Sequence, residues 1–283
     1  MVLLIVTSIL SSGFGLLVRY SQRKGCNLFA VGAVNYISAS LFHVVLVLVS
    51  GVPAPHAPTI WIGVLGGFAY SFTFLIFLKF MHLRGLSITA VIMRMSVVVP
   101  LFFSLAVWGE TATAIQLIGT LFTLLSLPFL ALTPRQTPGK VPVRSILLLV
   151  TLFFGVGMCS LSIRGYHQTG LRGEENLFFA TLFGTAAIVM TTAWLTGKER
   201  THVRDVPHGI AVGLSNAIHN RLLIVCLQIL PTILVYPFFT TVGLIFTIVV
   251  CWFLWGERIS RREMIGTVIA ALGILLINLK LHL

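Results

Sequence analysis

Acidic residues are scarce in this chain: only 7 of its 283 residues are Asp or Glu, and 9% of all residues are charged. Soluble globular domains average about 25% charged residues, so this composition excludes that class. The hydrophobic fraction of 57% and the mean hydropathy of +1.03 indicate an integral membrane protein, with the lipid bilayer as its main partner.

Cysteines and catalytic motifs are also sparse. The four cysteines are Cys26, Cys159, Cys226 and Cys251. They show no CxxC or other metal-ligand spacing, so neither a disulfide framework nor a metal site is expected. The chain lacks GxxxxGKS/T, HExxH and GxSxG, which argues against a nucleotide-driven pump and against an intramembrane enzyme. We therefore expect no enzymatic activity and no cofactor.

Basic residues outnumber acidic ones, and the formal net charge is +12. They cluster in short loops between apolar runs, where they set membrane orientation and do not indicate nucleic-acid binding. Fourteen of the 19 fall on one predicted side, which the positive-inside rule makes cytoplasmic and which places both termini outside. The predicted location is the cytoplasmic (inner) membrane.

A helix needs about 20 apolar residues to cross a bilayer, and only helices satisfy their backbone there without closing a barrel. The predicted fold is therefore all-α, with ten spans near 2–20, 28–50, 59–82, 86–107, 113–132, 145–166, 176–196, 207–229, 231–255 and 263–281.

A repeat relates the two halves of the chain. The stretch VWGETATAIQLIGT from Val107 returns 147 positions later as LWGERISRREMIGT from Leu254. Because five spans, an odd number, separate the copies, equivalent helices cross in opposite directions. The predicted organisation is a five-helix repeat over 1–134, a linker over 135–144 and an inverted repeat over 145–283. Inverted repeats are typical of secondary transporters, whose substrate site lies near the midplane.

The repeated motif itself is interpreted as structural. Gly109 and Gly256 come just after a span, where a helix readily ends. Glu110 and Glu257 precede the next helix, so we expect each carboxylate to interact with the positive end of that helix dipole.

These features resemble the EamA-type branch of the drug/metabolite transporter superfamily. The resemblance rests on two five-helix halves, each with GE after its fourth helix and a glycine nine residues later, at Gly119 and at Gly266. It implies a central cavity lined by the first, third and fourth helices of each half. Family members include amino-acid and metabolite exporters, sugar carriers and phosphate-coupled antiporters. They are usually described with both termini inside, opposite to the charge count.

Two arginines, Arg94 and Arg221, are predicted inside spans. An ionised group at that depth costs about 2.5–3.5 kcal/mol on insertion scales, so it normally faces a cavity or a partner. No carboxylate lies within a predicted span, which makes an anionic substrate the leading candidate partner. A guanidinium suits carboxylate or phosphate oxygens. The alternative is that each arginine bonds backbone carbonyls and stabilises the fold.

The span around Arg221 is unusually polar. Asn216, His219 and Asn220 are spaced i, i+3, i+4 and share one helix face. Asparagine amides both donate and accept, and His219 is the only plausible proton carrier in this cluster. The alternative for all three is interhelical hydrogen bonding. Two aromatic residues, Tyr70 and Tyr236, are added as candidate cavity residues.

The predicted function is a secondary transporter that moves a small anionic or zwitterionic metabolite by alternating access. An exporter of neutral solutes or drugs with structural arginines is the alternative, and an intramembrane enzyme is a remote one. The sequence leaves open the substrate, the direction of transport, coupling to a proton or counter-substrate, and the oligomeric state.

Overall fold

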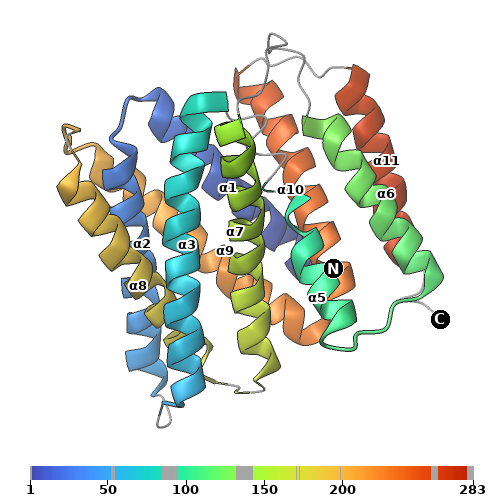
Figure 1. The fold of residues 1–283 in the computed structure, drawn as a ribbon, viewed down its shortest axis with the longest axis horizontal. Coiled ribbons are helices and arrows are strands. Elements are labelled where there is room, and N and C mark those ends of the chain that lie inside the picture. Colours follow the sequence, from blue (N-terminus) through green and yellow to red (C-terminus); the bar gives the residue numbers. More distant parts are fainter. Residues whose placement is uncertain are drawn as a thin grey trace. The chain divides into compact units, whose positions relative to one another are not determined.

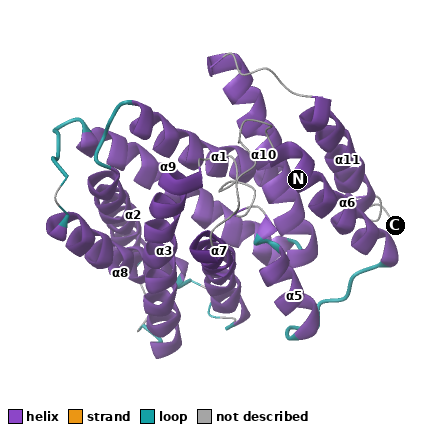
Figure 2. Ribbon diagram, turned by 45° about the horizontal axis from the view of Figure 1, so that its top comes forward, coloured by secondary structure: helices purple, strands orange, loops and turns teal. Residues whose placement is uncertain are grey.

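The computed structural model describes residues 2–51, 55–84, 93, 95–131, 143–169, 171, 173–197, 199–255 and 261–278. All regular secondary structure in these residues is helical (Figures 1 and 2). The helices are α1 (Val2–Arg23), α2 (Leu28–Ser50), α3 (Ala57–Arg84), α5 (Val98–Ala106), α6 (Ala114–Ala131), α7 (Val143–Gln168), α8 (Glu175–Thr196), α9 (Asp205–Ile229), α10 (Thr232–Trp255) and α11 (Arg261–Asn278).

The predicted all-helical, membrane-type architecture is confirmed. Five of the described helices are long and apolar enough to cross a membrane: Val2–Arg23, Leu28–Ser50, Ala57–Lys79, Glu175–Thr196 and Asp205–Ile229. Helix bounds follow the predicted spans closely, because the length of an apolar run sets the length of a spanning helix. The exception is the fourth span, 86–107, where α5 covers nine residues and Arg94 lies outside the described part of the chain.

The chain divides into two compact units. Unit 1 comprises Met1–Ser8, Ile76–Gly157 and Cys226–Leu283, and unit 2 comprises Ile9–Leu75 and Met158–Val225. Each unit contains residues from both predicted halves, because helices of one half pack against helices of the other, as α2 does on α8 and α6 on α11. The boundaries of the two repeats therefore stay a prediction.

In unit 2, α2 packs along α8. Gly32 lies against Met190, and further along α2 the hydroxyl of Ser40 donates to the carbonyl of Ala180 at 3.1 Å. Residue numbers rise along α2 while they fall along α8, so the two helices are antiparallel. A Cβ atom on Gly32 would lie 2.6 Å from the Phe74 ring of α3 and 2.8 Å from Met190 Cε of α8, so glycine leaves room for both side chains.

Two GxxxG motifs bring other helices of unit 2 together. Gly63 and Gly67 on α3 face α8, and Gly209 and Gly213 on α9 face α2. A Cβ atom on Gly67 would lie 2.6 Å from a side-chain carbon of α8, and one on Gly209 would lie 2.5 Å from a side-chain carbon of α2. Both distances are far below van der Waals contact, so only glycine allows the helices to pack this closely.

In unit 1, α6 packs along α11, and α10 contacts α5, α6 and α11. Both ribbon views place α6 beside α11 (Figures 1 and 2). Gly273 of α11 approaches the backbone of α6 at Gly119, again because no side chain intervenes. Small residues at such crossings maximise packing where lipid provides no hydrophobic drive.

The first copy of the repeated motif ends α5 as predicted. The helix stops at Ala106, and Gly109 follows with φ +64°, a left-handed conformation that favours glycine. The amide of Glu110 donates back to the carbonyl of Ser104 at 3.1 Å and closes the turn. Gly256 and Glu257 of the second copy lie outside the described residues.

The expected interaction of Glu110 with the dipole of the following helix stays a prediction, but its carboxylate also reaches a helix distant in sequence. Its carboxylate accepts a hydrogen bond from the hydroxyl of Thr232, the first residue of α10, at 2.6 Å. The next helix, α6, is capped locally: Thr113 and Gln116 exchange side-chain to backbone hydrogen bonds at 3.0 and 3.3 Å, as in a capping box. The carboxylate of Glu110 thus binds the first residue of α10, a helix distant in sequence. Thr113 and Gln116 cap α6 without it.

Candidate functional site

The structure places most of the predicted binding residues in one unit. Unit 2 contains Tyr70, Asn216, His219, Asn220 and Arg221. Tyr70 belongs to α3 and the other four to α9. Tyr236 is buried on α10, in unit 1. Arg94 is not among the described residues.

Three helices of unit 2 share a chain of hydrogen bonds. The hydroxyl of Tyr70 donates to Asn220 Oδ1 at 3.0 Å. Asn220 Nδ2 donates to Asn216 Oδ1 at 2.7 Å, and Asn216 Nδ2 donates to Asn35 Oδ1 at 3.2 Å. The three asparagines are almost completely buried, and Asn35 belongs to α2. The chain therefore links α3, α9 and α2 through polar groups inside apolar helices.

A main-chain carbonyl determines the direction of this chain. Asn220 Nδ2 also lies 2.9 Å from the carbonyl oxygen of Asn216, which can only accept. The amide nitrogen of Asn220 must therefore point toward Asn216, so the contacting side-chain atom of Asn216 is its oxygen. By the same logic Asn216 presents its nitrogen to Asn35, and Asn35 presents its oxygen in return.

The chain of hydrogen bonds ends at the side-chain nitrogen, Nδ2, of Asn35. The residue is 0% exposed, and its Nδ2 has no hydrogen-bond partner among the described residues. A buried donor without a partner costs about 1–3 kcal/mol, so its retention calls for an explanation. Sequence reasoning missed Asn35; the signal was an amide within the apolar run of the second span.

His219 takes different partners from its neighbours on the same face. Its Nδ1 donates to the carbonyl of Ser215 at 2.9 Å, and its ring lies 6.2 Å from the ring of Phe14 on α1. The hydroxyl of Ser215 donates to the carbonyl of Leu10 at 3.0 Å, which also joins α9 to α1. The predicted face is thus divided: Asn216 and Asn220 meet α2 and α3, whereas His219 meets α1.

Arg221 has an acidic neighbour, contrary to the expectation that no buried acid was available. Its Nη2 lies 4.0 Å from Oε2 of Glu175, a buried residue in the first turn of α8. The sequence did not reveal this pair because Glu175 lies at a helix end, and helix packing brings that end to the level of Arg221. Arg221 Nη1 is buried and has no hydrogen-bond partner among the described residues.

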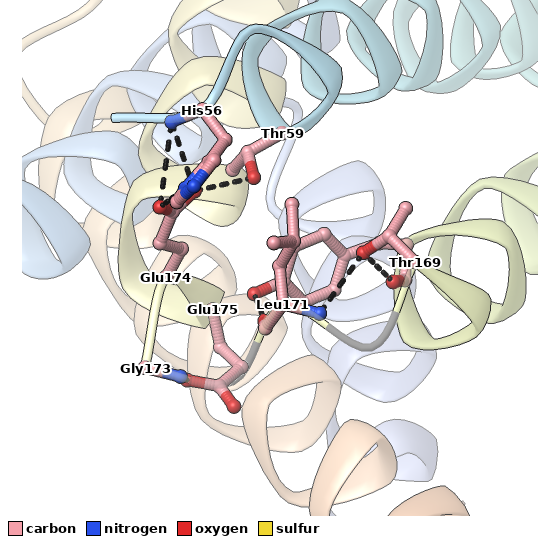
Figure 3. Close-up of polar contacts among 8 residues, drawn as sticks. His56, Thr59, Thr169, Leu171, Gly173, Glu174 and Glu175 are labelled. Atoms are coloured by element: carbon pink, nitrogen blue, oxygen red, sulfur yellow. Dashed lines mark hydrogen bonds and ion pairs between the residues drawn. The ribbon is translucent and has the colours of Figure 1, made fainter. Parts of the chain in front are cut away.

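A second carboxylate, Glu174, joins the starts of α8 and α3 (Figure 3). It accepts hydrogen bonds from His56 Nδ1 and from the hydroxyl of Thr59, both at 2.5 Å. Its side chain is 2% exposed. Burial alone raises the pKa of Glu174, but these hydrogen bonds outweigh it and hold the pKa below its ordinary value of 4.5.

A similar junction joins the starts of α2 and α9. The side chain of Asn27 caps α2 by accepting hydrogen bonds from the main-chain amides of Phe29 and Ala30. The main-chain amide of Asn27 donates to Asp205 Oδ1 at 3.3 Å. Asp205, the first residue of α9, also accepts from the amide of His202 at 2.8 Å. In both junctions a buried carboxylate connects the starts of two helices that are distant in sequence.

The lowered pKa of Glu174 predicts a pH dependence of stability. Because the folded pKa lies below the unfolded one, the stabilisation is complete above about pH 4.5 and is lost as the pH falls through the folded pKa. Glu174→Gln should cost about 1–3 kcal/mol near neutral pH. The melting temperatures of wild type and variant should converge on acidification, measured by thermal unfolding in detergent.

Glu199→Gln is the matched control, because Glu199 is exposed and its backbone carbonyl, which the substitution leaves in place, accepts from Asn27 Nδ2. This variant should follow the wild type at every pH. A constant difference between wild type and Glu174→Gln down to pH 3 would contradict the assignment.

Metal binding finds no support in the described part of the chain: no group of three or more His, Cys, Asp or Glu side chains there is arranged to hold an ion. The candidate site is therefore composed of amides, hydroxyls, an imidazole and one guanidinium with its carboxylate. Such a set binds polar solutes by hydrogen bonds and charge.

The helices and the polar chain within them define an α-helical membrane protein. No protein-family profile matches the sequence, and no curated protein matches it significantly. Twenty-eight chains of known structure match the fold. One, a crystal structure, aligns with a TM-score of 0.79 and 14% sequence identity, over 97% of this chain and 94% of that chain. At this identity the likeness establishes a shared fold alone.

Proposed function

We propose that the protein is a secondary transporter of the EamA type in the drug/metabolite transporter superfamily. Its ten spans form two inverted five-helix repeats, and it moves a small anionic or zwitterionic metabolite by alternating access. The observation that carries the proposal is the buried chain Tyr70, Asn220, Asn216 and Asn35, with Arg221 adjacent on α9. Polar and ionisable groups inside spanning helices are costly and mark substrate pathways.

Helix pairing supports the inverted repeat. Helices α2 and α8 are the second spans of the two halves, α6 and α11 are the fifth, and each pair packs together. A two-fold axis in the membrane plane brings equivalent helices together in this way and makes them antiparallel, as α2 and α8 are.

The glycine motifs obey the same symmetry. The third span of each half carries one GxxxG, at Gly63 and Gly67 on α3 and at Gly209 and Gly213 on α9. Each motif packs against the second span of the opposite half. The junctions at Glu174 and at Asp205 likewise connect a second span to the third span of the other half.

One observation favours the alternative function. Glu175 near Arg221 provides that arginine with a partner inside the protein, as expected for a structural arginine in an exporter of neutral solutes. The separation of 4.0 Å is too long for a hydrogen bond, however, and Nη1, which has no hydrogen-bond partner among the residues that the structure describes, suits an oxygen of an anionic solute.

Transport by the purified protein in proteoliposomes tests the proposal. Radiolabelled L-serine, succinate and glycerol 3-phosphate serve as probes of zwitterionic, carboxylate and phosphate chemistry. We expect saturable uptake of at least one probe, driven by its own gradient and inhibited by the same unlabelled compound. Protein-free liposomes are the control. Uptake at the control level for all three probes would refute the function proposed here.

A further inference from the structure

We propose that Asn35 on α2 binds an oxygen atom of the transported solute through its Nδ2 group. The inference rests on the proposed function and extends it to a residue and a helix outside the cavity-lining helices that the family resemblance implies. It identifies the chemistry of the solute group at this point as a hydrogen-bond acceptor.

The hydrogen-bond chain has a fixed direction. The Asn216 carbonyl orients Asn220, which in turn orients Asn216 and then Asn35. Every amide nitrogen in the chain but the last has an acceptor within the protein. The whole network therefore presents one donor group at its end, Asn35 Nδ2, and a rotation of the Asn35 amide would break its bond to Asn216.

A donor at the end of the chain selects which solute groups can bind there. A carboxylate, phosphate or carbonyl oxygen can accept from Nδ2, whereas an ammonium group has no lone pair to offer. A solute with both charges would therefore place its oxygen end at Asn35. Polarisation along a hydrogen-bonded chain strengthens the terminal donor, so Tyr70, Asn220 and Asn216 assist this contact without touching the solute.

Retaining this amide group has an energetic cost. Asn35 is 0% exposed, and its Nδ2, which has no hydrogen-bond partner in the described part of the chain, lies within an apolar span. If Asn35 served only to join helices, the hydrogen bond that its Oδ1 accepts from Asn216 would be enough. Its Nδ2 group would then contribute only the cost of a buried donor without an acceptor. Binding of an acceptor during transport removes that penalty and gives the amide nitrogen a use.

The test compares Asn35→Asp and Asn35→Leu with wild type in the proteoliposome assay, using whichever of L-serine, succinate and glycerol 3-phosphate the wild type transports. Aspartate keeps the oxygen that accepts from Asn216 and replaces the donor with an acceptor. We expect KM to rise at least about ten-fold, equivalent to about 1.4 kcal/mol, with kcat changed less than about two-fold. Leucine should have a similar effect on KM.

Ser38→Ala is the matched control, because Ser38 lies on the same helix and its hydroxyl donates to the carbonyls of Val34 and Asn35 within that helix. Its KM should equal that of the wild type. An unchanged KM in Asn35→Asp together with a lower melting temperature would show that the amide is structural or bound to a buried water. That result overturns the inference and leaves the transport function intact, whereas absence of wild-type uptake overturns both.

Discussion

Replacing Arg221 by glutamine is expected to raise KM for the transported probe roughly 10- to 100-fold, the loss that corresponds to one charge-assisted hydrogen bond. The Arg221 side chain is 30% exposed, its buried Nη1 has no hydrogen-bond partner among the described residues, and its Nη2 lies 4.0 Å from Oε2 of Glu175. It can therefore bind an anionic oxygen without giving up an existing hydrogen bond. Uptake in proteoliposomes measures the effect.

Two further variants separate substrate binding from a structural role of Arg221. Arg221→Lys keeps the charge but loses the planar fork, so an intermediate KM is expected. Glu175→Gln removes the acidic neighbour and should leave KM equal to the wild-type value or lower it. If Arg221→Gln and Glu175→Gln instead lower the melting temperature equally and leave KM unchanged, the arginine is structural. Arg261→Gln, at an exposed position on α11, controls for charge.

Gly213→Ala is expected to destabilise the protein by about 1–3 kcal/mol, the usual cost of overpacking. A methyl group there would overlap the hydroxyl of Ser38 and the carbonyl oxygen of Asn35 on α2. Backbone atoms cannot rotate away as a side chain can, so α9 and α2 would have to separate. The same separation would lengthen the hydrogen bond between Asn216 and Asn35. Gly67→Ala should behave alike, because it faces the backbone of α8.

Glycines in open surroundings provide the control and an effect of opposite sign. A Cβ atom on Gly15 or on Gly165 would meet nothing within 4 Å. Alanine at these helical positions should be neutral or stabilising by up to about 1 kcal/mol, because it restricts the unfolded backbone. Thermal unfolding of the four variants in detergent provides the comparison. Equal effects at Gly213 and Gly165 would contradict the close packing of α9 on α2.

Three of the four residues in the hydrogen-bond network, Tyr70, Asn216 and Asn220, were candidates from the sequence, and local spacing predicted one pairing among them. Asn216 and Asn220 are four residues apart, so any helix places them on one face, and the structure joins them by a 2.7 Å hydrogen bond. The pairing of Tyr70 with Asn220, and the presence of Asn35 in the network, were not accessible from the sequence. Asn35 and Tyr70 are each more than 140 residues from Asn220, and only helix packing selects them from the other polar residues of the apolar runs.

The carboxylates show the same limit. Every carboxylate was predicted to lie outside the spans; in the structure Glu110 lies between α5 and α6, and Glu175 is the first residue of α8. Glu110 was assigned to the helix that follows it, because a chain position reveals only its local neighbours. In the structure it bonds Thr232 of α10, while Glu175 lies near Arg221 of α9. Both partners belong to helices distant in the chain.

The sequence by itself determined that this is an all-helical membrane protein and, outside the fourth span, approximately where the described helices begin and end, because hydrophobicity, run length and helix-ending residues act locally along the chain. Tertiary structure alone decided which buried polar groups meet and in which direction the side-chain amides of Asn220, Asn216 and Asn35 point. It also decided that Arg221 lies near an acidic residue. Those outcomes depend on close approaches at glycines between helices distant in sequence. A single added methyl group at such a glycine would push the helices apart and change which side chains come within hydrogen-bonding distance.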